Sequence, residues 1–146
     1  MEVGSMRGTP FHSSTAARTN STWWYSWGGY LVPDVYTDLH AELGAIRNGA
    51  AMNEMSPIPK TEIKGPDCRL FVDYLFPRDI SKMQVGSAWY APCCTDDGMV
   101  VADGIVFRFD EDRFVFAADN CTQYFKKRAG LFDVSVNNVT DDYGIL

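Results

Sequence analysis

The sequence predicts an α+β fold, with a mixed, largely antiparallel sheet and packed helices. Segments with helical spacing and segments with alternating hydrophobicity follow one another irregularly, unlike the regular order of a wound parallel sheet. Residues 88–119 contain alternating segments joined by short acidic turns, which is typical of antiparallel hairpins. The chain has 146 residues, 46% of them hydrophobic, which is enough for one domain with a core.

The N-terminal part contains a polar stretch and an aromatic cluster. Residues 1–20 are rich in Ser and Thr, so we expect a flexible arm there and a folded domain over residues 21–146. The stretch "WWYSWGGYLVP" follows, and we interpret its rings as the cover of one end of a core. Rings of this size can also wall a flat ligand. The cluster consists of Trp23, Trp24, Tyr25, Trp27 and Tyr30.

Two helices are predicted in the first half of the chain. The first has Asp34 as its N-cap and Gly49 as its end, with an apolar stripe of Val35, Leu39, Leu43 and Ile46. The stretch "PIPKTEIKG" then predicts a short strand. The second helix, "GPDCRLFVDYLF", opens with Pro66 in its first turn. Its expected inner face consists of Leu70, Phe71, Tyr74 and Leu75.

The second half predicts a series of strands and one short helix. "GSAWYAPCC" is a strand, "TDDG" is a turn, and residues 98–109 form the next strand. "DED" at 110–112 closes a hairpin onto "RFVFAAD". Asp119 or Asn120 is expected to cap a short helix that ends in the basic residues 126–128, before a last strand that begins at "FDVSV".

One carboxylate interrupts the strand at 98–109. Alternation places Asp103 on the same face as Val101, Ile105 and Phe107, which is the more apolar face. Such a residue can lie at a sheet edge in water, accept buried hydrogen bonds from the backbone, or be held in a pocket for charge chemistry. The adjacent Gly104 slightly favours a pocket, because glycine inside a strand often marks a bulge or a close approach.

Composition excludes several classes of protein. The chain has 13 basic and 19 acidic residues, a net charge of −6, and no basic stripe for nucleic acid or anionic lipid. We find no apolar run of membrane-spanning length and no secretory signal, so a cytoplasmic location is expected. The cysteines lack a CxxC spacing, so reduced thiols and no metal site are expected; they are Cys68, Cys93, Cys94 and Cys121.

A set of motifs in a fixed order resembles a known family. The stretches are "TPFH", "WGGYLVP", "SPIPKTEIKGPDC", the Tyr of "SAWY", and "DDGMVVADGIVFRFDEDRF". Together they resemble the folate-binding domain of the glycine cleavage T-protein (aminomethyltransferase) superfamily, from Thr9 to about Asp142. The form "VADGIVFR" is closer to the superfamily's tetrahydrofolate-dependent demethylase-like members.

The resemblance implies tetrahydrofolate as the cofactor and roles for six residues. Asp103 falls on the family's catalytic aspartate, and Tyr90 falls on a tyrosine that lines the folate cavity. Ile58, Ile105 and Phe107 fall on further wall positions, and Asp119 falls on a family asparagine. The implied reaction is transfer of a methyl or aminomethyl group to the folate from a small N-, O- or S-methylated or aminomethyl donor.

Some stretches depart from the family pattern. "MNEMSPIP" stands where the T-protein has "LFDVSHMG", with Glu54 and Ile58 in place of its Asp and Met. These changes weaken the case for a glycine-derived aminomethyl substrate. A stretch much like the T-protein motif, "AGLFDVS" at 129–135, follows the Asp103 hairpin rather than preceding it, and we interpret it as a chance match within a strand.

Members of the family are longer than this chain, so we expect its partner to be a missing C-terminal part or a second subunit. Two other functions remain open. One is a folate-binding relative without transferase activity, and the other is an interaction module that docks through the aromatic cluster. The carboxylate retained at Asp103 favours the transferase over the folate-binding relative.

Overall fold

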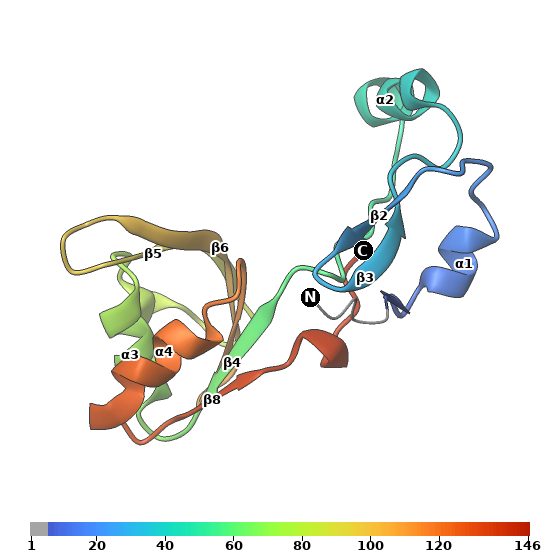
Figure 1. Ribbon diagram of the computed structural model, residues 1–146. Helices are drawn as coiled ribbons and strands as arrows, with labels where there is room; N and C mark the ends of the chain where they lie inside the picture. Colours follow the sequence, from blue (N-terminus) through green and yellow to red (C-terminus); the bar gives the residue numbers. More distant parts are fainter. Residues whose placement is uncertain (1–5) are drawn as a thin grey trace. The chain divides into compact units, whose positions relative to one another are not determined.

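The computed structural model describes residues 6–146, and its chain forms two compact units (Figure 1). The first unit runs up to Pro57 and also includes Asp141–Leu146. The second unit comprises Ile58–Thr140. The predicted division into an arm over residues 1–20 and a domain over residues 21–146 stays a prediction. Residues 1–5 lie outside the described residues, and the rest of that stretch contains a short strand and a helix.

The second unit is built on an antiparallel sheet with the strand order β5-β6-β7-β4-β8. This sheet, together with the helices, confirms the predicted α+β class. The hairpin between residues 99–109 and 113–119 is also confirmed, with its turn at Glu111 and Asp112. The strands are β4 (Lys60–Lys64), β5 (Ala88–Cys94), β6 (Val100–Asp110), β7 (Arg113–Ala117) and β8 (Ser135–Asn138).

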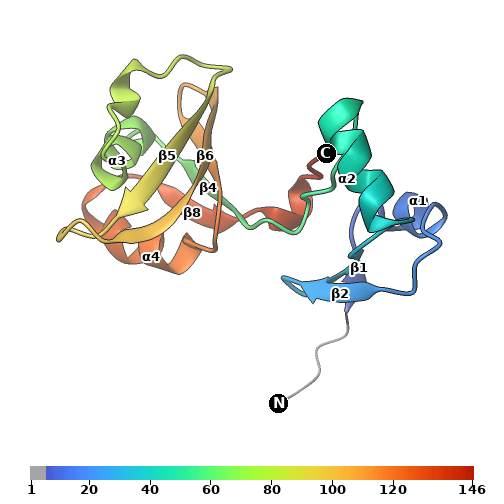
Figure 2. The ribbon, with the colours of Figure 1, turned by 90° about the horizontal axis from the view of Figure 1, so that it is seen from above.

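Helices α3 (Cys68–Leu75) and α4 (Thr122–Arg128) pack on this sheet, and their side chains form the core together with those of the strands (Figure 2). Three short 3-10 turns complete the secondary structure, at Ile80–Lys82, Ala129–Leu131 and Thr140–Asp142. Phe125 of α4 joins the helices to the sheet, because its ring centroid lies 5.9 Å from that of Phe116 in β7 and 6.5 Å from that of Phe71 in α3. The core includes Ile63, Phe71, Val72, Leu75, Ala91, Cys93, Val106, Phe114, Phe116 and Phe125.

The predicted inner face of α3 was partly wrong. Leu70 and Tyr74 are 65% and 55% exposed. The helix begins at Cys68, and the stripe that it buries is Cys68, Phe71, Val72 and Leu75. That stripe also has helical spacing, so two overlapping apolar stripes exist in the sequence, and packing against the sheet selects one of them. The N-cap of α4 is Cys121 rather than the predicted Asp119 or Asn120, although the Asn120 side chain accepts a hydrogen bond from the Thr122 amide at 3.2 Å.

Gly104 lies where two backbones come close together. A Cβ atom at this position would stand 2.1 Å from the Ala117 carbonyl oxygen and 2.7 Å from the Ala118 Cβ. Both atoms belong to the end of β7 and the residue that follows it. The glycine therefore permits close contact within the sheet, and its place there is explained without a ligand.

The first unit contains a three-stranded sheet with the order β1-β3-β2. Its strands are β1 (Arg7–Gly8), β2 (Trp24–Trp27) and β3 (Tyr30–Pro33), and its helices are α1 (His12–Ala16) and α2 (Leu39–Asn48). Arg7 joins the two sequence segments of this unit, because its guanidinium forms an ion pair with Asp141 at 2.7 Å. Tyr30 also donates a hydrogen bond to the Asp141 carboxylate.

Helix α2 begins later than predicted. Its N-cap is Asp38 rather than Asp34, and the Asp38 carboxylate accepts a hydrogen bond from the Ala41 amide at 2.9 Å. Gly49 ends the helix, as predicted. The apolar stripe of α2 is not buried within the described residues: the exposed fractions are 54% for Leu39, 42% for Leu43 and 63% for Ile46.

Membrane-spanning helices and clusters of metal ligands are both absent from residues 6–146. No helix among them is long and apolar enough to cross a membrane. In the same residues, no group of three or more His, Cys, Asp or Glu side chains is arranged to hold a metal ion. All four cysteines are free thiols.

Candidate functional site

The candidate site lies on the outer face of β5 and β6, which we define as the side opposite the core contributed by α3 and α4. Along β6, Ala102, Val106 and Arg108 are buried on the core side. Asp103 is exposed on the alternate side, and Ile105 and Phe107 are only partly buried there. The apolar face seen in the sequence is therefore not the core face of this unit.

Asp103 and Tyr90 form a hydrogen-bonded pair on the outer face. Tyr90 is opposite Ile105 in the β5–β6 register, and Asp103 is opposite Pro92, so both side chains leave the same side of the sheet. The Tyr90 hydroxyl donates a hydrogen bond to Asp103 Oδ2 at 2.8 Å. This bond to a carboxylate is the main cause that raises the pKa of the Tyr90 phenol.

The geometry excludes one of the three interpretations of Asp103. A structural carboxylate would be buried and would accept hydrogen bonds from backbone amides. Asp103 is instead exposed, and the hydrogen bond that it accepts comes from the Tyr90 side chain. The buried structural interpretation is wrong, and the carboxylate lies where a bound molecule can reach it.

Apolar side chains lie beside this pair. Ile105 is directly opposite Tyr90, and Phe107 is opposite Ala88 one step further along the hairpin. The Phe107 ring stacks on the Phe109 ring, with centroids 6.1 Å apart and an interplanar angle of 27°. Together with Tyr90, they form a partly exposed apolar surface next to a carboxylate.

Ile58 and Asp119 lie near the same end of the sheet but are not joined to the pair. Asp119 is exposed in the bend that follows β7, and Ile58 precedes β4. A hydrogen bond of 3.1 Å from the Ala118 amide to the Pro59 carbonyl holds these two segments together. Among residues 6–146, no hydrogen bond or ion pair connects Ile58 or Asp119 to Tyr90 or Asp103.

One residue near the pair was missed by the sequence analysis. Arg78 donates a hydrogen bond to the Tyr90 carbonyl at 2.8 Å, and its guanidinium lies over the Trp89 ring, 4.2 Å from the centroid. Both contacts hold the β5 backbone at Tyr90. No local pattern marks Arg78, because its contacts are with residues that are distant in the sequence.

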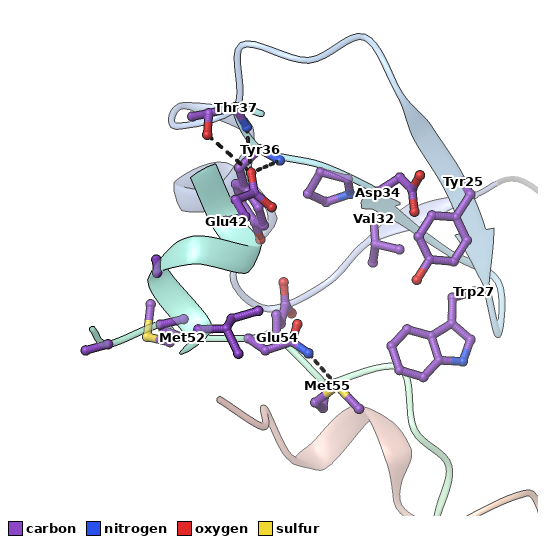
Figure 3. Close-up of a pocket in the computed structure, with 16 residues that line it drawn as sticks. Tyr25, Trp27, Val32, Asp34, Tyr36, Thr37, Glu42, Met52, Glu54 and Met55 are labelled. Atoms are coloured by element: carbon purple, nitrogen blue, oxygen red, sulfur yellow. Dashed lines mark hydrogen bonds between the residues drawn. The ribbon is translucent and has the colours of Figure 1, made fainter. Parts of the chain in front are cut away.

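A separate cavity of about 930 Å³ lies within the first unit (Figure 3). Strand β2 contributes Tyr25 and Trp27 to its wall, so the rings of the aromatic cluster have different environments. Trp23 is 69% exposed, whereas Tyr30 is buried. A smaller cavity of about 450 Å³ adjoins some of the same residues. The larger cavity is lined by residues 25, 27, 32–34, 36, 37, 42, 45, 46 and 50–55.

The outer face has the chemistry to bind a flat molecule that carries amine or amide groups. An exposed carboxylate accepts hydrogen bonds from N–H groups and stabilises nearby positive charge. The Tyr90 ring and the apolar side chains provide surface for an aromatic ring. The Tyr90 hydroxyl fixes the position of the Asp103 carboxylate through their hydrogen bond.

Comparisons with known proteins agree with one another. Residues 13–146 match the profile of the family described as the GCVT N-terminal domain. The chain is 31% identical to a probable aminomethyltransferase of Halobacterium salinarum, over 97% of this chain and 41% of that protein. It is 34% identical to an aminomethyltransferase of Alkaliphilus metalliredigens, over 79% of this chain and 32% of that protein.

A solved structure has the same fold. It is the glycine cleavage system aminomethyltransferase T of Bartonella henselae, with a TM-score of 0.76 and 20% sequence identity. The match covers 93% of this chain and 39% of that one. The chain thus spans about two fifths of that protein, and between 32% and 41% of the two relatives above.

Proposed function

The chain belongs to the GCVT N-terminal domain family, and from this premise we propose that it forms part of the folate-binding region of a one-carbon transferase. The reaction moves a methyl or aminomethyl group from a small N-, O- or S-methylated or aminomethyl donor to tetrahydrofolate. Because the chain spans less than half of its relatives, the remaining wall of the site comes from a further polypeptide segment. That segment belongs either to the same enzyme or to a second subunit.

The hydrogen-bonded pair of Tyr90 and Asp103 is the observation that carries this proposal. An exposed carboxylate that is oriented by a tyrosine on an otherwise apolar surface has no evident role in stability. In the proposed reaction, Asp103 orients the amine of the donor or of the folate and stabilises positive charge that develops as the carbon moves. Tyr90 keeps the carboxylate in place, and its ring lies against the folate.

The residues present fit a folate. Its flat ring system would lie against Tyr90, Ile105 and Phe107, which are all at least partly accessible on one face. Ile58 and Asp119, at the same end of the sheet, are proposed as its more distant contacts. When bound, tetrahydrofolate supplies the nitrogen that accepts the one-carbon unit. The chain's own part is to bind that molecule, exclude water from its apolar side and hold negative charge at Asp103.

Substitution of Asp103 tests the proposal. Asp103→Asn keeps the size of the side chain and removes its charge. In the complete protein, we expect turnover to fall about a hundredfold or more, as for other preorganised charged groups. The melting temperature should stay within one or two degrees, because Asp103 is exposed. Product formation on the folate is measured by chromatography, and Asp96→Asn, an exposed carboxylate in the β5–β6 turn, is the matched control.

Two results would contradict the proposal. Retained turnover together with a clear loss of stability would return Asp103 to a structural role. Retained folate binding with no transfer in the unmodified complete protein would favour the folate-binding relative without activity. Residues 1–146 alone are expected to bind tetrahydrofolate weakly or not at all, because the polar contacts of the second wall are missing and each good one is worth about 1 kcal/mol or more.

A further inference from the structure

The cavity of the first unit is lined by a carboxylate that has no hydrogen-bond partner among residues 6–146. Both carboxylate oxygens of Glu54 expose less than 1 Å², and neither accepts a hydrogen bond from any residue within 6–146. A buried carboxylate without a partner is costly, and an ion at the site is one common explanation for such a group. Glu54 belongs to the first unit, whereas Asp103 belongs to the second.

The neighbouring carboxylates differ from Glu54 in their contacts. Glu42 Oε1 accepts hydrogen bonds from the Tyr36 and Thr37 amides, at 2.8 Å and 2.7 Å. These hydrogen bonds give Glu42 a structural role at the start of α2. Asp34 lines the same cavity and is exposed. Three acidic side chains thus surround the space, and in the described part of the chain its lining includes no Lys, Arg or His.

Aromatic rings surround the same space. Figure 3 shows Glu54 between Met52 and Met55, with Tyr36 on one side and with Tyr25 and Trp27 opposite. The faces of Trp and Tyr rings attract cations, most strongly where water is excluded. The pKa of Tyr36 is raised, first by burial and then by the negative charges of Glu54 and Glu42. The negative charges of Glu54 and Glu42 therefore attract a cation to the same space as the ring faces do.

One cation in the lining of the adjoining smaller cavity has a partner of its own. Arg18 lines the adjoining smaller cavity together with Glu54, but its Nη1 donates to the Ser14 carbonyl at 3.0 Å. Residues 6–146 therefore supply negative charge and aromatic surface at this cavity, and none of their ion pairs includes Glu54.

We propose that this cavity binds a small organic cation that carries methyl groups on its nitrogen, such as a trimethylammonium or dimethylammonium group. Methylated nitrogen fits better than a metal ion, because no three acidic side chains among residues 6–146 are arranged to hold a metal, whereas the wall offers aromatic and thioether surface. It also fits better than a primary amine, which requires several hydrogen-bond acceptors. The ring faces contact the methyl groups, and the buried Glu54 carboxylate supplies the balancing negative charge. The cavity is large enough for such a molecule.

Calorimetric titration of the full chain tests the proposal with two probes of equal shape. Choline carries a trimethylammonium group, and 3,3-dimethyl-1-butanol is its neutral carbon analogue. We expect choline to bind at least about tenfold more tightly than the neutral analogue, since only the charged probe gains from the rings and from Glu54. Equal binding of both probes, or no binding of choline at millimolar concentration, would overturn the proposal.

Two pairs of variants locate the binding. Glu54→Gln should weaken choline binding about tenfold and leave the melting temperature unchanged or raised, because it removes an unpaired buried charge. Asp96→Asn removes the same charge outside the cavity and should have no effect on binding. Trp27→Leu should also weaken binding, whereas Trp23→Leu, at an exposed ring outside the lining, should not. Choline binding that is unchanged in both cavity variants would show that the site is elsewhere.

Discussion

The two faces of β6 use similar side chains in different ways. On one face, Val106 is 1% exposed and packs with Phe114 and Phe116 beneath the helices. On the other, Ile105 and Phe107 are only partly buried and lie beside the exposed Asp103. Each face carries one charge, but Arg108 on the core face is buried and paired with Glu111, whereas Asp103 on the outer face is exposed. A carboxylate within an apolar strand thus marks the face that the core does not use.

Neighbouring residues of β6 therefore contribute to different properties: those on the core face to stability and those on the outer face to function. Side chains on the core face are tightly surrounded, so their loss leaves a cavity that the fold cannot easily close. Side chains on the outer face are partly solvated, so the fold depends on them less. Substitutions on the two faces should therefore act on different measurements.

The largest expected contrast is between two phenylalanines on adjacent strands. Phe116 is 2% exposed and contacts the Phe76 ring at 4.9 Å, so Phe116→Ala should lower the free energy of unfolding by about 3–5 kcal/mol. Phe107→Ala, on the outer face, should cost less than about 2 kcal/mol. Denaturant titrations of both variants measure these values. Similar losses would show that the outer face is a second core.

The next contrast is between two glycines, Gly104 at a close approach of two backbones and Gly130 in open space. Gly104→Ala places a Cβ 2.1 Å from the Ala117 carbonyl oxygen, and it should cost at least about 2 kcal/mol of stability. Gly130→Ala is the control, because nothing lies within 4 Å of its added Cβ, and it should change stability by less than about 0.5 kcal/mol. Thermal unfolding compares the two. An unaffected Gly104→Ala variant would mean that β6 and β7 are less close than described.

The stability of the fold depends on pH through the buried thiols of Cys93 and Cys121. Burial raises the pKa of Cys93 from 9.0 to about 12 and that of Cys121 to about 11. The unfolded chain ionises these thiols near pH 9, whereas the folded chain keeps them protonated. Stability is therefore complete below pH 9 and is lost as pH rises toward 12.

Cys93→Ala tests this dependence. The substitution should reduce the stability lost between pH 8 and pH 10 by about 1 kcal/mol, whatever its effect at pH 8. Urea titrations at the two pH values give this difference. An unchanged difference between the two pH values would show that Cys93 does not remain protonated in the folded chain.

The smallest effect on stability is expected at Tyr90. Tyr90→Phe removes the hydrogen bond to Asp103 at a side chain that is 55% exposed, so stability should change by less than about 0.5 kcal/mol. Folate affinity in the complete protein should fall roughly threefold to tenfold, since the freed carboxylate is less well positioned. Tyr74→Phe, at a tyrosine of equal exposure on α3, should leave folate affinity unchanged. Equal effects of the two substitutions on affinity would end the assignment of Tyr90 to the site.

The sequence by itself determined the strands of the second unit and their order along the chain, but it did not predict β1, β2 or β3 of the first unit. Period-two alternation and the turns at 95–98 and 110–112 predicted the β5–β6–β7 meander, because both signals are local. Alternation also placed Asp103 on the same face as Ile105 and Phe107. The ordered motifs, from "WGGYLVP" to "VADGIVFR", were enough to indicate the family that the comparisons confirm.

Only the tertiary structure decided which faces are buried. Two apolar stripes of equal periodicity exist on α3, and contact with the sheet buried the one that contains Val72 and left Leu70 exposed. The stripe on α2 has good spacing and is not buried in the described residues. Periodicity shows that side chains share a face, but it cannot show what covers that face.

The same limit applies to the two candidate sites. The hydrogen bond from Tyr90 to Asp103 joins strands through a register that no single segment encodes. The unpartnered state of Glu54 depends on the absence of donors from distant segments, which the sequence does not reveal. Local patterns report a residue's own backbone geometry, whereas burial and partnership are properties of the packed chain, and only the tertiary structure decides them.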